Sequence, residues 1–270
     1  MRRYAGLMFL LSALWANGVG AQTVAQPVEL ISVPVDYHGR QIQLTGELQK
    51  PIGPGPFPVV IALHSCGGYW YPSSIPIWLS LFWQQGYATL HLDSFSARGY
   101  AGICAKTDEV TTGERASDAL AAAYVLAGRP DIQREHIAVI GWSHGGGSAA
   151  AVATDRPGRR SAHEKLASGG GKLVASVDLY GGCDLASYRV LVPLLVLVGS
   201  SDDWVNGGAS CLALAKANPA FMTVQVYPGA HHGFDDPNTH LYLSHMMSYN
   251  AAATADAQVR VVQFLRRFMQ

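Results

Sequence analysis

A serine flanked by glycines and preceded by an apolar run is the feature that most constrains this chain. The apolar run covers residues 137–140, and the pentapeptide Gly-Trp-Ser-His-Gly follows at 141–145. Residues 146–151 are all glycine, serine or alanine. In a tight strand-to-helix turn, the positions two residues before and after the apex leave no room for large side chains, so glycine is expected at both. The pattern predicts a buried strand, a sharp turn with Ser143 at its apex, and a closely packed helix.

Apolar runs that alternate with helical patterns predict the fold class. The continuous run at 59–63 is typical of a strand buried on both faces of a sheet. Further strands are expected at 28–37, 41–48, 87–92, 173–179, 194–198 and 223–227, and helices at 113–128, 208–217 and 251–268. This alternation favours an α/β fold with a mostly parallel central sheet and helices on both faces.

One polar, glycine-rich insertion interrupts this pattern at 156–171. It contains four glycines and few apolar residues, so we expect a surface loop. A mobile flap over the functional site is the alternative interpretation.

The first 21 residues have the pattern of a secretory signal peptide. Arg2 and Arg3 give a positive start, the apolar stretch 7–15 is too short to span a bilayer, and small residues at 19–21 suit cleavage before Gln22. An uncleaved amphipathic anchor is the alternative. No later segment is long and apolar enough to insert stably into a membrane. We therefore predict a periplasmic or secreted protein whose mature chain, 22–270, forms a single domain.

Composition narrows the classes of partner. The formal net charge is zero, charged residues make up 14% of the chain, and no basic stripe is present. Nucleic acid is therefore not expected as a partner. We expect a small-molecule substrate and no cofactor. The oligomeric state is not predicted.

Four cysteines remain after the predicted signal peptide: Cys66, Cys104, Cys183 and Cys211. In an oxidising compartment an even number favours disulfides, for which three pairings are possible. We favour Cys66 with Cys104 and Cys183 with Cys211, because each pair would join loops at the same edge of the sheet. Free buried thiols are the alternative. The absence of a C-x-x-C spacing argues against a zinc site, and no metal is predicted.

A serine hydroxyl is a poor nucleophile without a base to accept its proton and a carboxylate to orient that base. Asp202 and Asp203 follow the predicted strand 194–198 and are the acid candidates. Neighbours in an extended loop face opposite ways, so only one can reach the imidazole, and we favour Asp202. Asp178 is a weaker rival, because it lies inside a predicted strand.

The base candidates are His231 and His232, in the loop after the final strand, and we favour His232. The adjacent histidines with Asp235 and Asp236 do not form an established metal-ligand spacing. Both aspartates are expected to be turn residues before Pro237.

Acyl chemistry also needs donors for the developing oxyanion. We assign these to the backbone N–H of His144, just after the serine, and of Cys66, in the loop after the strand 59–63. Aromatic residues beside these segments could line an apolar acyl pocket: Tyr69, Trp70, Trp142 and Trp204. Ordinary core packing is the alternative for all four.

Five separated segments together resemble the dienelactone hydrolase family of the α/β-hydrolase superfamily. They lie at 63–68, 93–99, 141–146, 199–204 and 227–234. The resemblance covers about residues 57–268 and implies an α/β-hydrolase fold that hydrolyses an ester or lactone. It also implies that Asp202 is the acid, that His232 is the base, and that the Cys66 N–H is an oxyanion donor.

The chain departs from the family pattern at the nucleophile. The enzymes that name the family use a cysteine where this chain has Ser143, and carry a glutamate where it has Ser65. The sequence therefore looks more like exported, serine-bearing relatives. Asp93 and Arg98 match the family and are read as a brace for a loop near the site, with substrate binding by Arg98 as the alternative.

We therefore predict a serine hydrolase that cleaves a carboxylic ester or lactone through a Ser-His-Asp triad and an acyl-enzyme. A peptidase or acyltransferase with the same triad is the alternative, and a non-catalytic binding protein is the third hypothesis.

Overall fold

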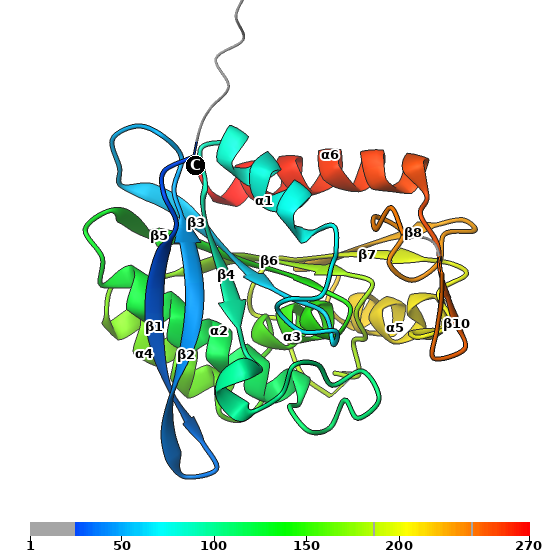
Figure 1. Ribbon diagram of the computed structural model, residues 1–270, viewed down its shortest axis with the longest axis horizontal. Coiled ribbons are helices and arrows are strands. Elements are labelled where there is room, and N and C mark those ends of the chain that lie inside the picture. Colours follow the sequence, from blue (N-terminus) through cyan, green and yellow to red (C-terminus); the bar gives the residue numbers. More distant parts are fainter. Residues whose placement is uncertain (1–24, 186, 239) are drawn as a thin grey trace, which may run out of the picture.

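An eight-stranded sheet forms the centre of the molecule (Figure 1). The computed structural model describes residues 25–185, 187–238 and 240–270, so the predicted signal peptide lies outside the described residues. The strand order is β1-β2-β4-β3-β5-β6-β7-β8. The strands are β1 (Glu29–Tyr37), β2 (Arg40–Gln49), β3 (Phe57–Leu63), β4 (Ala88–Asp93), β5 (Ile132–Trp142), β6 (Leu173–Leu179), β7 (Leu194–Gly199) and β8 (Met222–Tyr227).

Six neighbouring strands, β4-β3-β5-β6-β7-β8, are parallel to one another. The remaining two, β1 and β2, form an antiparallel hairpin beside β4. Burial explains why parallel and antiparallel strands have different sequence patterns. Every residue of β7 is buried, as expected for a parallel strand covered on both faces. Buried and exposed residues alternate along β1, because one face of this edge strand meets solvent. The predicted mostly parallel sheet is confirmed.

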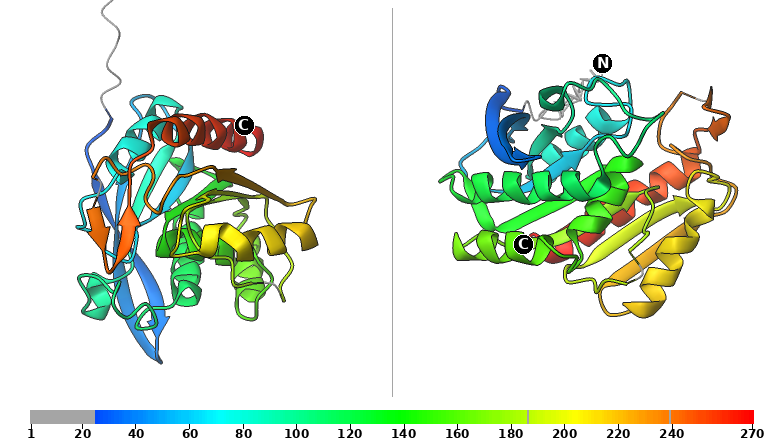
Figure 2. Two further views of the ribbon diagram at one scale, coloured as in Figure 1. Left: turned by 90° about the vertical axis from the view of Figure 1, so that its right-hand side faces the viewer. Right: turned by 90° about the horizontal axis from the view of Figure 1, so that it is seen from below.

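Helices cover both faces of the sheet (Figure 2). The helices are α1 (Ile75–Gln84), α2 (Thr112–Ala127), α3 (His144–Val152), α4 (Arg159–Ser168), α5 (Ala209–Ala217) and α6 (Ala251–Phe268). One buried cluster joins α1 and α6 to one face of the sheet and includes Trp78, Phe82, Val261 and Leu265. A second cluster joins α2, α3 and α5 to the other face. Among the described residues, no helix is both long and apolar enough to cross a bilayer.

The prediction of a surface loop at 156–171 is wrong, because most of this segment forms α4. Leu166 is buried, and α4 packs against α2. The flap interpretation is not tested by these contacts and stays a prediction. The sequence signal was weak because α4 buries little apart from Leu166 and Arg159.

A short hairpin near the end of the chain was not predicted. It consists of β9 (His240–Tyr242) and β10 (His245–Met247), which pair antiparallel. Each strand has only three residues, so no alternation of apolar and polar residues can develop. The hairpin lies beside the loop that carries His232, because His232 and Met247 form an isolated parallel bridge.

Both predicted disulfides are present: Cys66 pairs with Cys104, and Cys183 pairs with Cys211. No described cysteine is free. Cys66 and Cys183 both follow parallel strands, β3 and β6, at their carboxyl ends. Each disulfide therefore fixes a loop at the edge of the sheet where α/β folds carry their sites.

The brace that was predicted between Asp93 and Arg98 uses another carboxylate. Arg98 forms two hydrogen bonds of 2.8 Å with Asp118 of α2, and a third with the carbonyl oxygen of Ser94. Asp93 instead accepts hydrogen bonds from the backbone N–H groups of Phe95 and Ser96. Arg98 therefore fixes the loop after β4 against α2, and its buried guanidinium is not presented to a substrate.

We predict that Arg98→Met destabilises the fold by about 3–5 kcal/mol, because it leaves the Asp118 carboxylate buried without its cation. Urea denaturation followed by circular dichroism measures the loss. Arg260→Met is the matched control, since the Arg260–Asp256 pair lies on the surface and contributes at most about 1 kcal/mol. Equal losses in the two variants would contradict the prediction.

Candidate active site

Ser143 lies at the apex of the turn between β5 and α3, with φ 55° and ψ −118°. This is a backbone conformation that residues with side chains rarely adopt. The glycines on either side make it possible. A Cβ atom at Gly141 would collide with the carbonyl of Gly145, and one at Gly145 would collide with the carbonyl of Leu63. The predicted turn is therefore confirmed.

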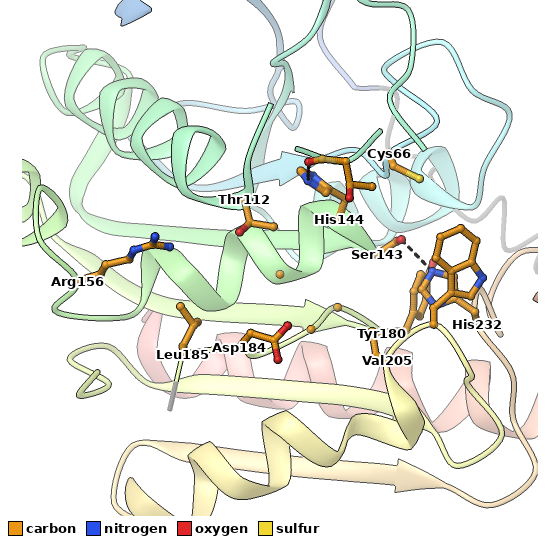
Figure 3. Close-up of a pocket in the computed structure, with 15 residues that line it drawn as sticks. Cys66, Thr112, Ser143, His144, Arg156, Tyr180, Asp184, Leu185, Val205 and His232 are labelled. Carbon is orange, nitrogen blue, oxygen red and sulfur yellow. Dashed lines mark hydrogen bonds between the residues drawn. The ribbon is translucent and has the colours of Figure 1, made fainter. Parts of the chain in front are cut away.

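A chain of two hydrogen bonds joins Ser143, His232 and Asp202 (Figure 3 draws the first). His232 Nε2 lies 2.8 Å from Ser143 Oγ, and His232 Nδ1 lies 2.8 Å from Asp202 Oδ2. Because an ionised carboxylate only accepts, Nδ1–H donates to Asp202, which leaves Nε2 to accept the serine proton. Both Asp202 and His232 are buried, and the N–H of Trp204 donates to the other oxygen of Asp202.

The rival residues lie elsewhere. Asp203 is exposed and pairs with His245 at 3.0 Å rather than with His232. Ser143 Oγ is hydrogen-bonded to His232 rather than to His231. Asp178 is buried at the end of β6 and accepts a 2.7 Å hydrogen bond from the N–H of Gly181. The structure thus brings together the favoured member of each predicted pair.

The two predicted oxyanion donors lie on segments that meet at Ser143, and Cys66 and His144 both line the cavity at the serine (Figure 3). His144 is the first residue of α3, where a backbone N–H has no intrahelical acceptor. The Cys66 N–H makes no hydrogen bond with a described residue. The loop of Cys66 is fixed by its disulfide and by a 2.8 Å hydrogen bond from Ile103 N–H to the Cys66 carbonyl.

Comparison with known proteins decides the family. The model of the dienelactone hydrolase family matches residues 44–269. The chain belongs to this family. No curated protein matches the sequence.

Solved structures of the dienelactone hydrolase family and of esterases share the fold. A dienelactone hydrolase from Anabaena variabilis is 21% identical, with a TM-score of 0.63 over 90% of this chain and 99% of that one. A dienelactone hydrolase-like promiscuous phosphotriesterase from metagenomic libraries is 20% identical, with a TM-score of 0.67 over 90% and 99%. A thermophilic carboxylesterase from a metagenomic library is 18% identical, with a TM-score of 0.63 over 92% and 91%.

Within this dienelactone hydrolase fold, a buried arginine lies behind both predicted oxyanion segments. Arg115 of α2 donates to the carbonyl of His64 at 2.7 Å and to Nδ1 of His144 at 2.9 Å. Burial lowers the pKa of Arg115 to about 9, which leaves it cationic at neutral pH. Burial and the charge of Arg115 lower the pKa of His144 to about 3, so that this imidazole is neutral. Arg115 was not predicted as a site residue, because in the sequence it looks like an ordinary polar residue of a helix.

Asp235 is not the simple turn residue that we expected. Its buried carboxylate accepts four side-chain hydrogen bonds: from Ser74, Trp78 and Tyr180 at 2.7 Å and from Trp142 at 3.2 Å. Burial raises the pKa of Asp235, and the hydrogen bonds from Tyr180, Ser74 and Trp78 oppose that shift. Asp236 does behave as a turn residue and accepts from the N–H of Asn238 at 2.9 Å.

Asp235 therefore connects the loop of His232 to residues on either side of the site. Trp142 precedes Ser143 in the chain, and the Tyr180 ring contacts His232 with centroids 4.9 Å apart. Tyr180 follows β6 directly, and its place at the carboxyl end of a predicted strand is the signal that could have identified it.

Two of the four predicted pocket residues line a cavity at Ser143. Trp142 lines a narrow cavity of about 50 Å³, and Trp204 lines both this cavity and a wider one of about 240 Å³. The Trp204 ring stacks on His232 with centroids 5.4 Å apart. The prediction is wrong for Tyr69 and Trp70. Tyr69 stacks on His91, and Trp70 is 77% exposed, and neither lines either of these two cavities.

Asp178, Cys183 and Cys211 come close enough together to suggest metal ligands. The two sulfurs are bonded to each other in a disulfide, so neither can act as a thiolate ligand. The group is therefore a buried carboxyl beside a disulfide.

We predict that Asp178 makes stability fall with rising pH. Burial raises its pKa to about 8, whereas an unfolded aspartate titrates near about 3.9. Between these values the folded state binds one more proton, so stability present below about pH 4 is lost progressively up to about pH 8. Asp178→Asn keeps an acceptor for the Gly181 N–H and removes the ionisation. As pH rises, the stability of this variant should therefore fall by less than that of the wild type.

Thermal unfolding at pH 5 and pH 8 measures this difference, which should be on the order of a few kcal/mol at pH 8. Asp184→Asn is the control, because Asp184 is exposed and should leave the pH dependence unchanged. Equal pH dependence in wild type and Asp178→Asn would refute this role of Asp178.

We predict that Asp235→Ala costs at least about 3 kcal/mol of stability, because it leaves four buried donors without an acceptor. Asp236→Ala should cost about 1 kcal/mol, since it removes hydrogen bonds only within its own turn. Urea denaturation of the two variants checks the order. The prediction fails if the Asp236 variant is the less stable one.

Proposed function

We propose that the protein is a serine hydrolase that cleaves carboxylic esters or lactones through an acyl-enzyme intermediate. One observation carries the proposal: Ser143 Oγ lies 2.8 Å from an imidazole whose other nitrogen lies 2.8 Å from a buried carboxylate. Family membership supports a hydrolase. The fold shared with carboxylesterases is consistent with ester chemistry.

In the first half-reaction, Ser143 Oγ attacks the acyl carbon while His232 Nε2 accepts the serine proton. Asp202 holds the imidazole in the required tautomer and stabilises its cationic form. The N–H groups of Cys66 and His144 bind the oxyanion, and a single strong donor of this kind contributes about 3–4 kcal/mol. His232 then gives its proton to the leaving alcohol.

In the second half-reaction, His232 accepts a proton from water, which attacks the acyl carbon and releases Ser143. Arg115 favours both steps, because its cation lies behind the segments that carry the two donors. The neutral His144 ring keeps a second cation out of the site.

We also propose that the mature protein acts in the periplasm or outside the cell. Two disulfides support this location, because structural disulfides persist in oxidising compartments and are rare in the cytosol.

We predict that Ser143→Ala lowers kcat for p-nitrophenyl acetate by a factor on the order of 10⁴ or more. Alanine removes the nucleophile and fits the same turn with little change in volume. Wild-type protein should react with a fluorophosphonate probe at Ser143, and the variant should not. Circular dichroism controls for folding, and unchanged turnover in a folded variant would remove Ser143 from the mechanism.

A further inference from the structure

Two cavities of unlike character meet at Ser143. Both are lined by the serine, by His232 and by three further residues: Cys66, Tyr180 and Trp204. The wider cavity has a volume of about 240 Å³ and the narrower one about 50 Å³. An ester carbonyl bound at Ser143 carries two substituents, its acyl chain and its alkoxy group. The two cavities therefore offer a separate place for each.

The narrow cavity fits a short apolar group. Its walls include Ile75, Trp142 and Met247. Its volume of about 50 Å³ is a small fraction of the volume of the wider cavity. The cavity therefore suits the methyl or ethyl group of an acetyl or propionyl ester better than a longer acyl chain.

The wide cavity fits a larger polar group. Its volume of about 240 Å³ is several times that of the narrow cavity and leaves room for a group the size of one sugar unit. It is lined by two threonines, Thr107 and Thr112, and by two charged residues, Arg156 and Asp184. Figure 3 shows Arg156 at the end remote from Ser143, with Asp184 on another wall.

Neither charged side chain has a hydrogen bond or ion pair with a described residue. Arg156 has only a distant contact with the Tyr188 ring, 5.8 Å from its centroid, and Asp184 is exposed. A guanidinium can only donate, and a carboxylate can only accept. A ligand that satisfies both must carry donors and acceptors, as hydroxyl groups do.

On the basis of the proposed hydrolase function, we propose that the substrate is an acetyl or propionyl ester of a hydroxyl-rich alcohol the size of one sugar unit. The acyl group belongs in the narrow cavity, because it stays on Ser143 after the first step. The alcohol belongs in the wide cavity, because it must leave before water can enter.

The reaction balances as an ordinary hydrolysis. The bond between Ser143 Oγ and the acyl carbon forms as the bond to the alcohol oxygen breaks, and the serine proton reaches that oxygen through His232. Water then supplies the hydroxyl of the acid and returns a proton to Ser143. The products are a short carboxylic acid and the free polyol.

The first test varies the acyl chain. We expect kcat/KM to fall at least about tenfold from p-nitrophenyl acetate to the hexanoate, the scale on which pockets discriminate by size. Met247→Ala should widen the narrow cavity and raise the hexanoate-to-acetate ratio at least about tenfold. Met246→Ala is the matched control, because this neighbour points away from the cavity and is 37% exposed. A wild-type preference for the hexanoate would overturn the acyl assignment.

The second test varies the alcohol at constant acyl group. We expect kcat/KM for a glucose monoacetate to exceed that for cyclohexyl acetate, which has a similar ring without hydroxyls. Arg156→Leu and Asp184→Leu should each reduce this preference at least about fivefold, the effect of losing a hydrogen bond to a charged group. Faster hydrolysis of cyclohexyl acetate by the wild type would overturn the polyol assignment.

Labelling separates this inference from the proposed function. If a fluorophosphonate modifies Ser143 but the substrate preferences are reversed, only the substrate assignment falls. If the folded protein neither reacts with the probe nor hydrolyses any ester, both the hydrolase function and the substrate assignment are overturned.

Discussion

The close approach of α3 to the sheet is the constraint on which the site depends. The carbonyls of Gly145 and Leu63 occupy the space that side chains at Gly141 and Gly145 would need. Because α3 lies so close to the sheet, the chain must turn sharply between β5 and α3. Ser143, at the apex of this turn, therefore has its unusual backbone conformation. Leu63 also ends β3 and precedes the loop of Cys66. The contact that shapes the serine turn therefore also brings the two proposed oxyanion donors together.

Buried charge is distributed unevenly around this turn. The cation of Arg115 lies behind the segments of Cys66 and His144, and the carboxylates of Asp202 and Asp235 lie on the histidine side. In a site of low dielectric such an arrangement favours an imidazolium near the carboxylates and an oxyanion near the guanidinium. These are the two charges that the proposed mechanism creates. Each buried group is held by several partners, so the arrangement is fixed before any substrate binds.

The sequence predicted the architecture well, because strongly apolar runs mark strands that are buried on both faces. It also identified the serine, the histidine and the aspartate that the structure brings together. These three residues could be identified from their order in the chain and from their positions directly after predicted strands, since parallel strands end at one edge of a sheet. Their catalytic roles stay predictions until activity is measured.

The errors and omissions have a common physical cause. The helix α4 was taken for a loop because its buried face is nearly limited to Leu166. Arg115 and Asp235 were missed as central residues because their importance comes from partners that are distant in the chain. Asp235, for example, accepts from Ser74, which is 161 residues away. Local patterns report which face of an element is buried, but they do not report which polar groups meet inside.

The two disulfides close chain loops with sequence separations of 38 and 28 residues. In the chain-entropy description, closing loops of this length restricts the unfolded ensemble by about 3.5–4 kcal/mol each. Together they match much of the net stability of a typical domain, about 5–15 kcal/mol. The thiol state of this polypeptide is therefore far closer to unfolding than the oxidised state, and the Cys66 loop is among the segments that reduction would release.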